Sequence, residues 1–395
     1  MRVLLCSEQP PLPPLNGSRL VLRALVRELA ARHELRLLSF GSAQGQDPTS
    51  IEGLPMRLLP RREERRRDLA SHLMHAIRTG RPMRVDGFAD QLRGPLEQEV
   101  RSFDPDVVHV MTGGLAGLGA QLIDHPAVLV ALDAAHLNVE DQAHESARLR
   151  RLQLLAEARR VRRFEADEYG RFPRVVVVSE VDRAALHAVD PELTIDVIAN
   201  GVDSNLFAPF PHDERSRAIV FHGVMNYAPN VGAAEYLARQ VWPRVRAVRE
   251  DAELAIVGRA PARRVRSLAA LDGVTVTGEV ADVRPWLSGS RIYACPMLTG
   301  TGIKNKLLEA MASGMACIAT PMALSGITAV PGRDLLVAKG EEELAAGVVR
   351  LLDDEGLARR LGRAAREYVR AEHDWTVVAQ AYERVYEAAL RSRHR

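Results

Sequence analysis

Short apolar runs that alternate with amphipathic segments constrain this chain more than any other feature of its sequence. Residues 3–7 (VLLCS) and 34–40 (ELRLLSF) have the composition of buried strands, and residues 20–33 between them have the apolar spacing of a helix. This order of strand, helix and strand is typical of a parallel β-sheet. Further strand-like runs follow at 106–111, 127–133, 174–180 and 195–200. The first half of the chain therefore predicts an α/β unit.

The alternation is interrupted once, by the proline-containing segment FAPFPHDE at 207–214. Strand-like runs then return at 218–223, 252–258, 274–280, 291–297 and 316–322. A chain of 395 residues is also too long for one ordinary hydrophobic core. We therefore predict two doubly wound, Rossmann-like α/β domains that face a cleft, with the boundary near 205–215.

Charge and cysteine usage exclude several classes of protein. A net charge of +2 gives no reason to expect an acidic polymer as partner, and no aromatic residues interleave the arginine runs as stacking platforms for nucleic acid. The three cysteines lie in separate apolar runs, so we expect buried thiols in a reducing compartment. The apolar run before Pro10 is too short for a signal peptide, which predicts a cytoplasmic protein.

The sequence contains no HExxH motif, no zinc-type cysteine spacing and no Ser-His-Asp order of the hydrolase type. Its one DxD string, Asp104 to Asp106, opens a strand that we expect to be buried. That position is unsuited to holding a metal beside a nucleotide. We predict neither a metal nor a cofactor.

A glycine-rich turn, TGTG at 299–302, precedes the helix-like segment IKNKLLEAMA. Gly300 and Gly302 would let the backbone approach a phosphate, and Thr301 could donate its hydroxyl. Lys304 and Lys306 add charge in a chain with only three lysines among its 53 basic residues, which favours a compact cation at this place. We predict a diphosphate site here; the alternative is an ordinary turn with two surface lysines.

The segment from Tyr293 to Thr320, YACPMLTGTGIKNKLLEAMASGMACIAT, resembles the donor-site signature of glycosyltransferase family 4. VIANGVDSNLFAP at 197–209 and FDPDVVHV at 103–110 resemble further segments of that family. The resemblance implies the GT-B fold and a hexosyltransferase that transfers a sugar from a nucleoside diphosphate without a metal and with retention of configuration. It also implies an acceptor domain at 1–205, a donor domain at 206–375, and a helix at 376–395 that packs back on the first domain.

Family members usually carry two glutamates in this signature. Glu309 matches the second, whose carboxylate we expect to accept hydrogen bonds from ribose hydroxyls. Thr301 stands at the first, as it does in a subset of the family with Gly-Thr-Gly-x-Lys. Lys304 is then expected to act in catalysis on the leaving diphosphate, with Lys306 beside it.

The segment FHGVMNYAPNVGAAEYL at 221–237 resembles a turn where many members place an Arg and a Lys on the diphosphate. Val224 and Pro229 occupy those places here, so Lys304 and Lys306 are expected to compensate, with Gly223 close to the donor. The resemblance further implies donor contacts from four residues of the loops around the base: Arg259, Gly278, Glu279 and Val280. The alternative is that the glycines only end strands and Arg259 is a solvated loop residue.

In the first half, resemblance implies that Gly17 faces the donor diphosphate, with Ser18 and Arg19 supporting it at the helix start. A plain helix-capping turn by Asn16 or Ser18 is the alternative. Asp133 ends a predicted strand and His136 follows it, so either could orient the acceptor hydroxyl as a catalytic residue. The sequence leaves the choice between them open.

The acceptor class also stays open: a glycan, a lipid-linked acceptor or a small molecule. Arginine runs at 148–163 and 61–67 are typical of a solvated face, but would also suit peripheral contact with the inner face of a membrane. Similarity to transferases of exopolysaccharide systems suggests surface-glycan or glycoconjugate biosynthesis. Two alternatives remain: a nucleotide-sugar epimerase of the same fold, and a non-catalytic nucleotide-sugar-binding protein.

Overall fold

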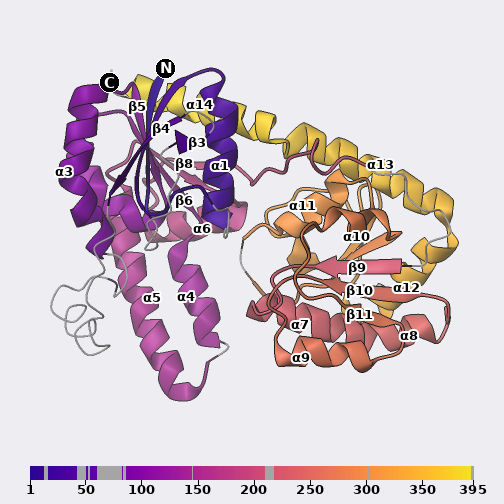
Figure 1. The fold of residues 1–395 in the computed structure, drawn as a ribbon. Coiled ribbons are helices and arrows are strands. Elements are labelled where there is room, and N and C mark those ends of the chain that lie inside the picture. The colour runs from indigo at the N-terminus through magenta and orange to yellow at the C-terminus, as the bar shows by residue number, and fades with distance from the viewer. Residues whose placement is uncertain are drawn as a thin grey trace. The chain divides into compact units, whose positions relative to one another are not determined.

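A computed structural model describes residues 1–12, 17–41, 50–51, 54–59, 82, 86–144, 146–209, 218–300 and 302–392. The chain divides into two compact units, Met1–Ala199 with Val378–Arg395 as unit 1 and Asn200–Val377 as unit 2. Figure 1 shows that each unit has a sheet with helices packed on it. Thr301, Asn16 and the basic segment 61–67 lie outside the described residues.

The predicted strands of the first half form one eight-stranded sheet in the order β3-β4-β2-β1-β5-β6-β7-β8. Every described pair in it is parallel except β3 with β4. The central strands are buried on both faces, which explains their continuous apolar sequence. The strands are β1 (Arg2–Ser7), β2 (Glu34–Phe40), β3 (Ser50–Ile51), β4 (Leu54–Leu59), β5 (Val107–Met111), β6 (Ala127–Leu132), β7 (Arg174–Val177) and β8 (Ile195–Val197).

Helices connect these strands, and two of them, α4 and α5, lie side by side and project beyond the sheet (Figure 1). The helices are α1 (Gly17–Ala30), α3 (Asp86–Phe103), η1 (Gly113–Gln121), α4 (Ala135–His144), α5 (Arg148–Tyr169) and α6 (Glu180–Val189). The last helix, α14 (Trp375–Ser392), places residues 378–392 in unit 1. There Tyr386 Oη lies 2.7 Å from Nδ1 of the buried His109, and burial lowers the pKa of His109 to about 3.

Unit 2 is built on a six-stranded parallel sheet in the order β11-β10-β9-β12-β13-β14. Its strands are β9 (Ala218–His222), β10 (Glu253–Val257), β11 (Val274–Val276), β12 (Ile292–Cys295), β13 (Ala316–Ala319) and β14 (Leu336–Val337). Its helices are α7 (Ala228–Tyr236), η2 (Leu237–Val241), α8 (Trp242–Arg246), α9 (Arg263–Arg266), η3 (Ser267–Ala270), α10 (Arg284–Ser288), α11 (Asn305–Ala312), η4 (Pro321–Leu324), α12 (Gly340–Asp353) and α13 (Glu355–Glu372). The prediction of two Rossmann-like α/β domains is confirmed.

The first unit ends at Ala199, before the boundary expected at 205. The backbone N–H of Val202 donates to His373 O at 2.7 Å, and a Cβ on Gly201 would lie 2.6 Å from the Trp375 ring. Residues 200–202 therefore pack against residues 373–375, at the end of unit 2. The three cysteines are free and buried, as expected, and burial raises the pKa of Cys6 to about 12 and that of Cys295 to about 11.

Candidate functional site

Unit 2 contains a pocket of about 340 Å³ at the carboxyl ends of β9 and β10 and the start of α11. Open parallel sheets bind ligands at this edge, because loops and helix starts converge there. Four predicted donor-site residues line it: Gly223, Val280, Lys306 and Glu309. The other lining residues are His222, Val224, Asn230, Val257, Gly258 and Val283.

Two glycines allow the ends of β9 and β10 to approach closely at the pocket. Gly258 has a φ of +146°, and a Cβ there would lie 1.8 Å from Gly223 O. A Cβ on Gly223 would lie 2.8 Å from Asn230 Nδ2. Any larger residue at either position would therefore push side chains or backbone into the pocket.

Lys306 supplies the pocket's positive charge. Its Nζ donates a short hydrogen bond to Asn230 Oδ1 and lies 5.6 Å from the centre of the Phe221 ring. Desolvation lowers the pKa of Lys306, although Glu309 opposes that shift. Among the described residues, no carboxylate lies within ion-pair distance of Lys306. A partly buried cation without a counterion carries a desolvation cost that a bound anion would offset.

Lys304 behaves differently from Lys306, although the sequence treats the two lysines alike. It is buried at the residue before α11, and its Nζ donates to Gly300 O at 2.8 Å and to Gly302 O at 2.6 Å. Both glycines have positive φ, +105° and +71°. Lys304 therefore holds the glycine-rich turn in shape. Pro229 packs against this turn, since a Cβ on Gly300 would lie 3.3 Å from it.

His222 is a site residue that the sequence analysis did not identify. It ends β9, and its Nε2 lies 2.7 Å from Oε2 of Glu309. Its ring stands edge-on to Tyr293, with 5.4 Å between ring centres. This contact holds one carboxylate oxygen of Glu309, whose side chain is 23% exposed at the pocket. A polar residue at the end of an otherwise apolar strand is the only sequence signal for His222.

The remaining predicted donor residues lie around the pocket without lining it. Gly278 has a φ of +72° and its carbonyl accepts from Gly258 N at 3.2 Å, so it shapes the base of the neighbouring loop. The carbonyl of Arg259 accepts from Met225 N at 2.9 Å. Glu279 is exposed to solvent. Of the four residues expected around the base, only Val280 lines the pocket, and Arg259 and Glu279 do not.

In unit 1, Gly17 begins α1, and a Cβ there would meet no heavy atom within 4 Å. Arg19 is buried, and its guanidinium donates to Pro10 O at 2.7 Å and to Leu12 O at 3.1 Å. Arg19 therefore holds the loop before α1, where we had expected it to support an anion.

Asp133 follows β6 at an irregular point of the sheet. Leu132 has a φ of +71°, and the pairing of β6 with β7 shifts between Val130 and Leu132. Such bulges redirect the side chains that follow them. The carboxylate of Asp133 accepts from Asn138 Nδ2 at 2.8 Å. Burial, with the nearby acids Asp182 and Glu165, raises the pKa of Asp133.

His136 is buried in α4 and paired with α5. Its Nδ1 lies 2.5 Å from Glu165 Oε2, and its backbone N–H donates to Glu165 Oε1 at 3.3 Å. Glu165 and Glu168 of α5 are buried. The arginines of the same helix are exposed, apart from the half-buried Arg160, so the solvated face expected for residues 148–163 is an arginine face that excludes these two glutamates.

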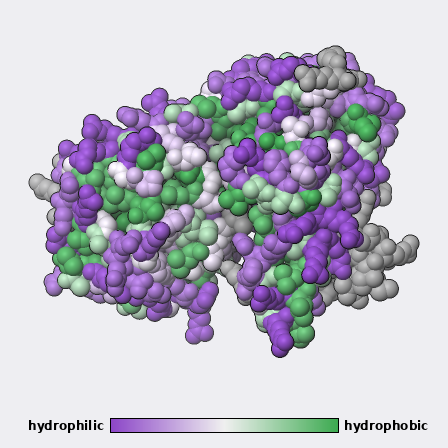
Figure 2. Space-filling model, turned by 180° about the vertical axis from the view of Figure 1, so that it is seen from behind, coloured by the Kyte–Doolittle hydropathy of each residue, from purple (hydrophilic) through white to green (hydrophobic). Residues whose placement is uncertain are grey.

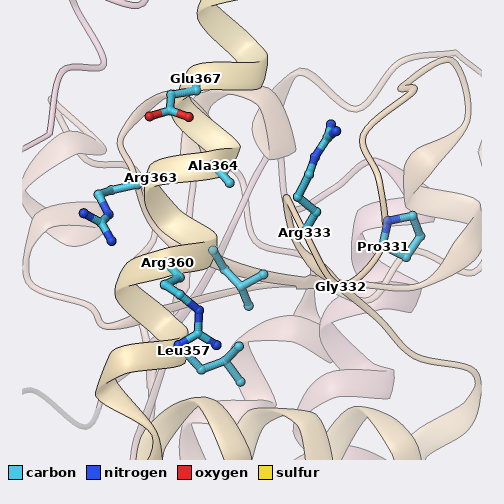
Figure 3. A pocket seen from close by; sticks show the side chains of 9 residues that line it. Pro331, Gly332, Arg333, Leu357, Arg360, Arg363, Ala364 and Glu367 are labelled. Carbon is cyan, nitrogen blue, oxygen red and sulfur yellow. The ribbon is translucent and has the colours of Figure 1, made fainter.

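A second pocket in unit 2, of about 600 Å³, lies between the turn at Pro331–Arg333 and α13 (Figure 3). Three of the residues that line it are arginines, but Figure 3 shows Arg363 on one side of α13 and Arg333 on the other. Arg333 also donates from Nε and Nη2 to the carboxylate of Asp334, at 2.8 Å each. The arginines do not converge on one point, so we assign no ligand there.

Two further types of site are absent from the described part of the chain. None of its helices is both long and apolar enough to cross a membrane. It also contains no group of three or more His, Cys, Asp or Glu side chains arranged to hold a metal ion.

Family models match both halves of the chain. The model described as "Glycosyltransferase Family 4" matches residues 15–206, and "Glycosyl transferases group 1" matches residues 216–354. A phosphatidyl-myo-inositol mannosyltransferase from Mycolicibacterium smegmatis is 32% identical over 201 residues. That match covers 48% of this chain and 51% of the relative, so the chain spans about half the length of this curated protein.

Solved structures match nearly the whole chain. The sucrose-phosphate synthase from Thermosynechococcus elongatus has a TM-score of 0.72 at 18% identity and covers 99% of this chain and 100% of its own. Anabaena HepE, solved with UDP and glucose, has a TM-score of 0.66 at 15% identity, covering 97% and 98%. Both likenesses concern the fold, which is GT-B. The family models, which together match residues 15–206 and 216–354, show that this chain belongs to glycosyltransferase family 4.

Proposed function

We propose that this protein transfers a glycosyl group from a nucleoside diphosphate sugar to an acceptor hydroxyl, with retention of configuration and without a metal or cofactor. The main support for the proposal is the pocket of unit 2, which Lys306 and Glu309 both line. Among the described residues, Lys306 forms no ion pair with a carboxylate. A cation and a carboxylate in one small pocket suit a ligand with both a phosphate and hydroxyl groups.

The leaving group of such a reaction is a nucleoside diphosphate, whose negative charge grows as the sugar departs. Lys306 would stabilise that charge, together with the backbone N–H groups at the start of α11. Lys304 would act through the turn that it holds between Gly300 and Gly302. Glu309, positioned by His222, would accept hydrogen bonds from the ribose hydroxyls.

Asp133 is the proposed acceptor-side residue. Its raised pKa and half-buried position would suit a hydrogen bond with the acceptor hydroxyl. In a retaining front-face reaction, the departing phosphate itself would take the acceptor proton. His136 is bound to Glu165 and would act by positioning the loop after β6.

The relatives favour a role in glycan or glycoconjugate biosynthesis, and we propose that the protein acts in the cytoplasm. The name of the mycobacterial relative describes mannosyl transfer to phosphatidyl-myo-inositol, and the Anabaena neighbour was solved with UDP. We propose a donor of this chemical class and an acceptor that is a glycan, a lipid-linked sugar or a small molecule, with no nucleic-acid partner.

Thermal unfolding with UDP-, GDP-, ADP- and dTDP-sugars tests the donor site. One of them should raise the Tm of the wild type and leave that of Lys306→Met unchanged. Lys339→Met is a matched control, because Lys339 is an exposed lysine before α12, away from the pocket. Equal stabilisation of the Lys306→Met protein would refute the assignment.

Mass spectrometry of the products with the stabilising donor then tests the reaction. Transfer or slow hydrolysis of the sugar is expected, with the anomeric configuration of the donor kept. Tight binding without any turnover over a broad set of acceptors, water included, would show a binding protein and overturn the proposed reaction.

A further inference from the structure

Asn230, in the first turn of α7, connects two sides of the pocket in unit 2 through one amide group. Its side chain is 4% exposed and lines the pocket. Its Oδ1 accepts the short hydrogen bond from Lys306 Nζ, and its Nδ2 donates to Val224 O at 3.0 Å. Asn230 therefore joins the turn after β9 to α11, the helix that carries the lysine.

These two contacts fix the orientation of the Asn230 amide. An ammonium can only donate and a backbone carbonyl can only accept, so the amide oxygen faces Lys306 and the amide nitrogen faces Val224 O. The backbone N–H of Asn230 also donates to Tyr227 O at 2.9 Å. A Cβ on Gly223 would lie 2.8 Å from Asn230 Nδ2, so the side chain packs closely against the end of β9. The amide is thus held rigidly before any ligand arrives.

The described groups in contact with Lys306 Nζ are all neutral. Besides Asn230 Oδ1, they are the Phe221 ring, whose centre is 5.6 Å away, and Met297 Sδ at 3.9 Å. Among the described residues no carboxylate forms an ion pair with it, although Glu309 lines the same pocket. Hydrophilic residues cover much of the face shown in Figure 2, where water screens exposed charges. Lys306 is half-buried beside apolar groups, so its charge is screened less.

We propose that Asn230 is a positioning residue, which holds Lys306 in the pocket while leaving its positive charge available to the diphosphate of the donor. An amide oxygen orients the ammonium through its dipole and adds no negative charge, whereas an aspartate would pair with Lys306 and offset that charge. Holding the lysine in advance also reduces the side-chain freedom lost on binding. The proposal rests on the proposed function, because it takes a diphosphate as the ligand of Lys306.

NMR of the lysine side chains tests the contact without any ligand. The chain has only three lysines, so protein labelled with ¹³C at the lysine ε carbons gives three signals, which substitution of each lysine in turn assigns. In Asn230→Asp the pKa of Lys306 should rise above its wild-type value, because an ion pair favours the charged form. In Asn230→Ala it should not rise. The exposed Lys339, away from the pocket, should titrate alike in every variant.

Calorimetry with UDP, GDP, ADP and dTDP tests the consequence for binding. The Kd of the nucleoside diphosphate that binds the wild type should rise by about tenfold in Asn230→Ala and by about a hundredfold in Asn230→Asp. Both variants lose the bond to Val224 O, so the difference between them reports the added charge. A purely structural role for Asn230 predicts the reverse order, because aspartate has nearly the shape of asparagine and alanine leaves a cavity.

Asn226→Asp is the matched control for charge. It places the same negative charge at an exposed position of the same turn, outside the lining of the pocket, and should change the Kd by less than about threefold. In a Lys306→Met background, Asn230→Ala should add less than about threefold, because Asn230 acts only through Lys306. Thermal unfolding checks that every variant stays folded.

Three results would overturn the proposal alone: an unchanged pKa of Lys306 in Asn230→Asp, weaker binding by Asn230→Ala than by Asn230→Asp, or a large further loss from Asn230→Ala in the Lys306→Met background. The last would mean that Asn230 itself contacts the ligand or shapes the pocket. If none of the four nucleoside diphosphates binds the wild type, the proposed function fails and this proposal fails with it.

Discussion

The two units use the same strand edge in opposite ways. In unit 2 the polar groups at the ends of β9 and β10 leave a pocket open, and Lys306 forms no ion pair there among the described residues, although Glu309 lines the same pocket. In unit 1 the polar groups after β6 bind one another: Asp133 with Asn138, and His136 with Glu165. One architecture thus provides a cationic recess in one unit and a closed, acidic cluster in the other. The difference suggests that donor binding and acceptor positioning are separable by mutation.

The largest expected effect is that of Lys306→Met. Loss of a charge-assisted contact to the leaving diphosphate should lower kcat/KM by at least about a hundredfold, or about 3 kcal/mol. The ligand-free protein should keep its Tm or gain slightly, because a desolvated cation without a counterion is removed. Steady-state kinetics and unfolding without ligand check the two halves of this prediction. A large loss of Tm would instead make Lys306 a structural residue.

The pH dependence of donor affinity is a second test of the proposed contact between Lys306 and the diphosphate. Desolvation lowers the pKa of Lys306, so the free protein releases this proton at a lower pH than an ordinary lysine does, whereas a bound diphosphate would raise the pKa again. Binding therefore takes up a proton once the pH exceeds the lowered pKa. Donor affinity should fall as the pH rises from there toward 10.5, the ordinary value, and Lys306→Arg should lack this decline. Calorimetry in buffers of different ionisation enthalpy measures the proton uptake.

Asp133→Asn, a change in unit 1, should cause the second largest loss of catalytic activity. We expect kcat to fall by about thirtyfold, or about 2 kcal/mol, with the donor Kd unchanged. Burial in the folded protein raises the pKa of Asp133, so folding favours the protonated carboxyl. This group therefore contributes to the free energy of unfolding at low pH, and the contribution is lost as the pH rises through the raised pKa. At pH 7 the asparagine variant should therefore be at least as stable as the wild type. A higher donor Kd in this variant would show that donor binding in unit 2 also depends on Asp133, against the proposed separation of the two functions.

Lys304→Met should have an intermediate effect that differs in kind from that of Lys306→Met. Loss of the hydrogen bonds to Gly300 O and Gly302 O should lower the stability of the folded protein by about 1–2 kcal/mol. The donor KM should rise by about tenfold, because the turn is less ordered. Denaturant unfolding distinguishes the two lysines. If Lys304→Met keeps full stability and loses turnover as Lys306→Met does, both cations act on the ligand.

The smallest effect is expected for His222→Leu. Loss of the contact to Glu309 should raise the donor KM by about threefold and leave kcat unchanged, because Glu309 remains but is less well oriented. His222→Gln, which can still donate to the carboxylate, should recover most of that loss. In a double-mutant cycle with Glu309→Gln, the two effects should not add. Additive effects would show that His222 acts independently of Glu309.

The sequence predicted what depends on local pattern. Alternating apolar runs predicted both sheets, and the glycine-rich turn with Glu309 predicted the region of the pocket. The role of Lys304 escaped prediction because it depends on where the carbonyls of the turn point. The pairing of His136 with Glu165 joins two helices across 29 residues, a distance at which sequence spacing carries no information about contact.

The arginine run of α5 is a second feature whose surroundings could not be predicted from the sequence. Its sequence alone does not reveal that the helix is packed at one end and exposed at the other. Glu165 and Glu168 are buried in the packed end of α5, whereas Leu149 and Leu152 are exposed at its other end. Periodicity indicates which residues share a helix face, whereas only the packing decides whether that face meets protein or solvent.

The path of the chain through α14 sets an order for folding during synthesis. Residues 200–377 form unit 2 without interruption, whereas unit 1 needs residues 378–392 to cover His109 with Tyr386. A ribosome therefore releases every residue of unit 2 before unit 1 can close its core. The first half of the chain must wait, incomplete, while residues 200–377 are synthesised, and during this interval it most needs chaperones to protect it from aggregation.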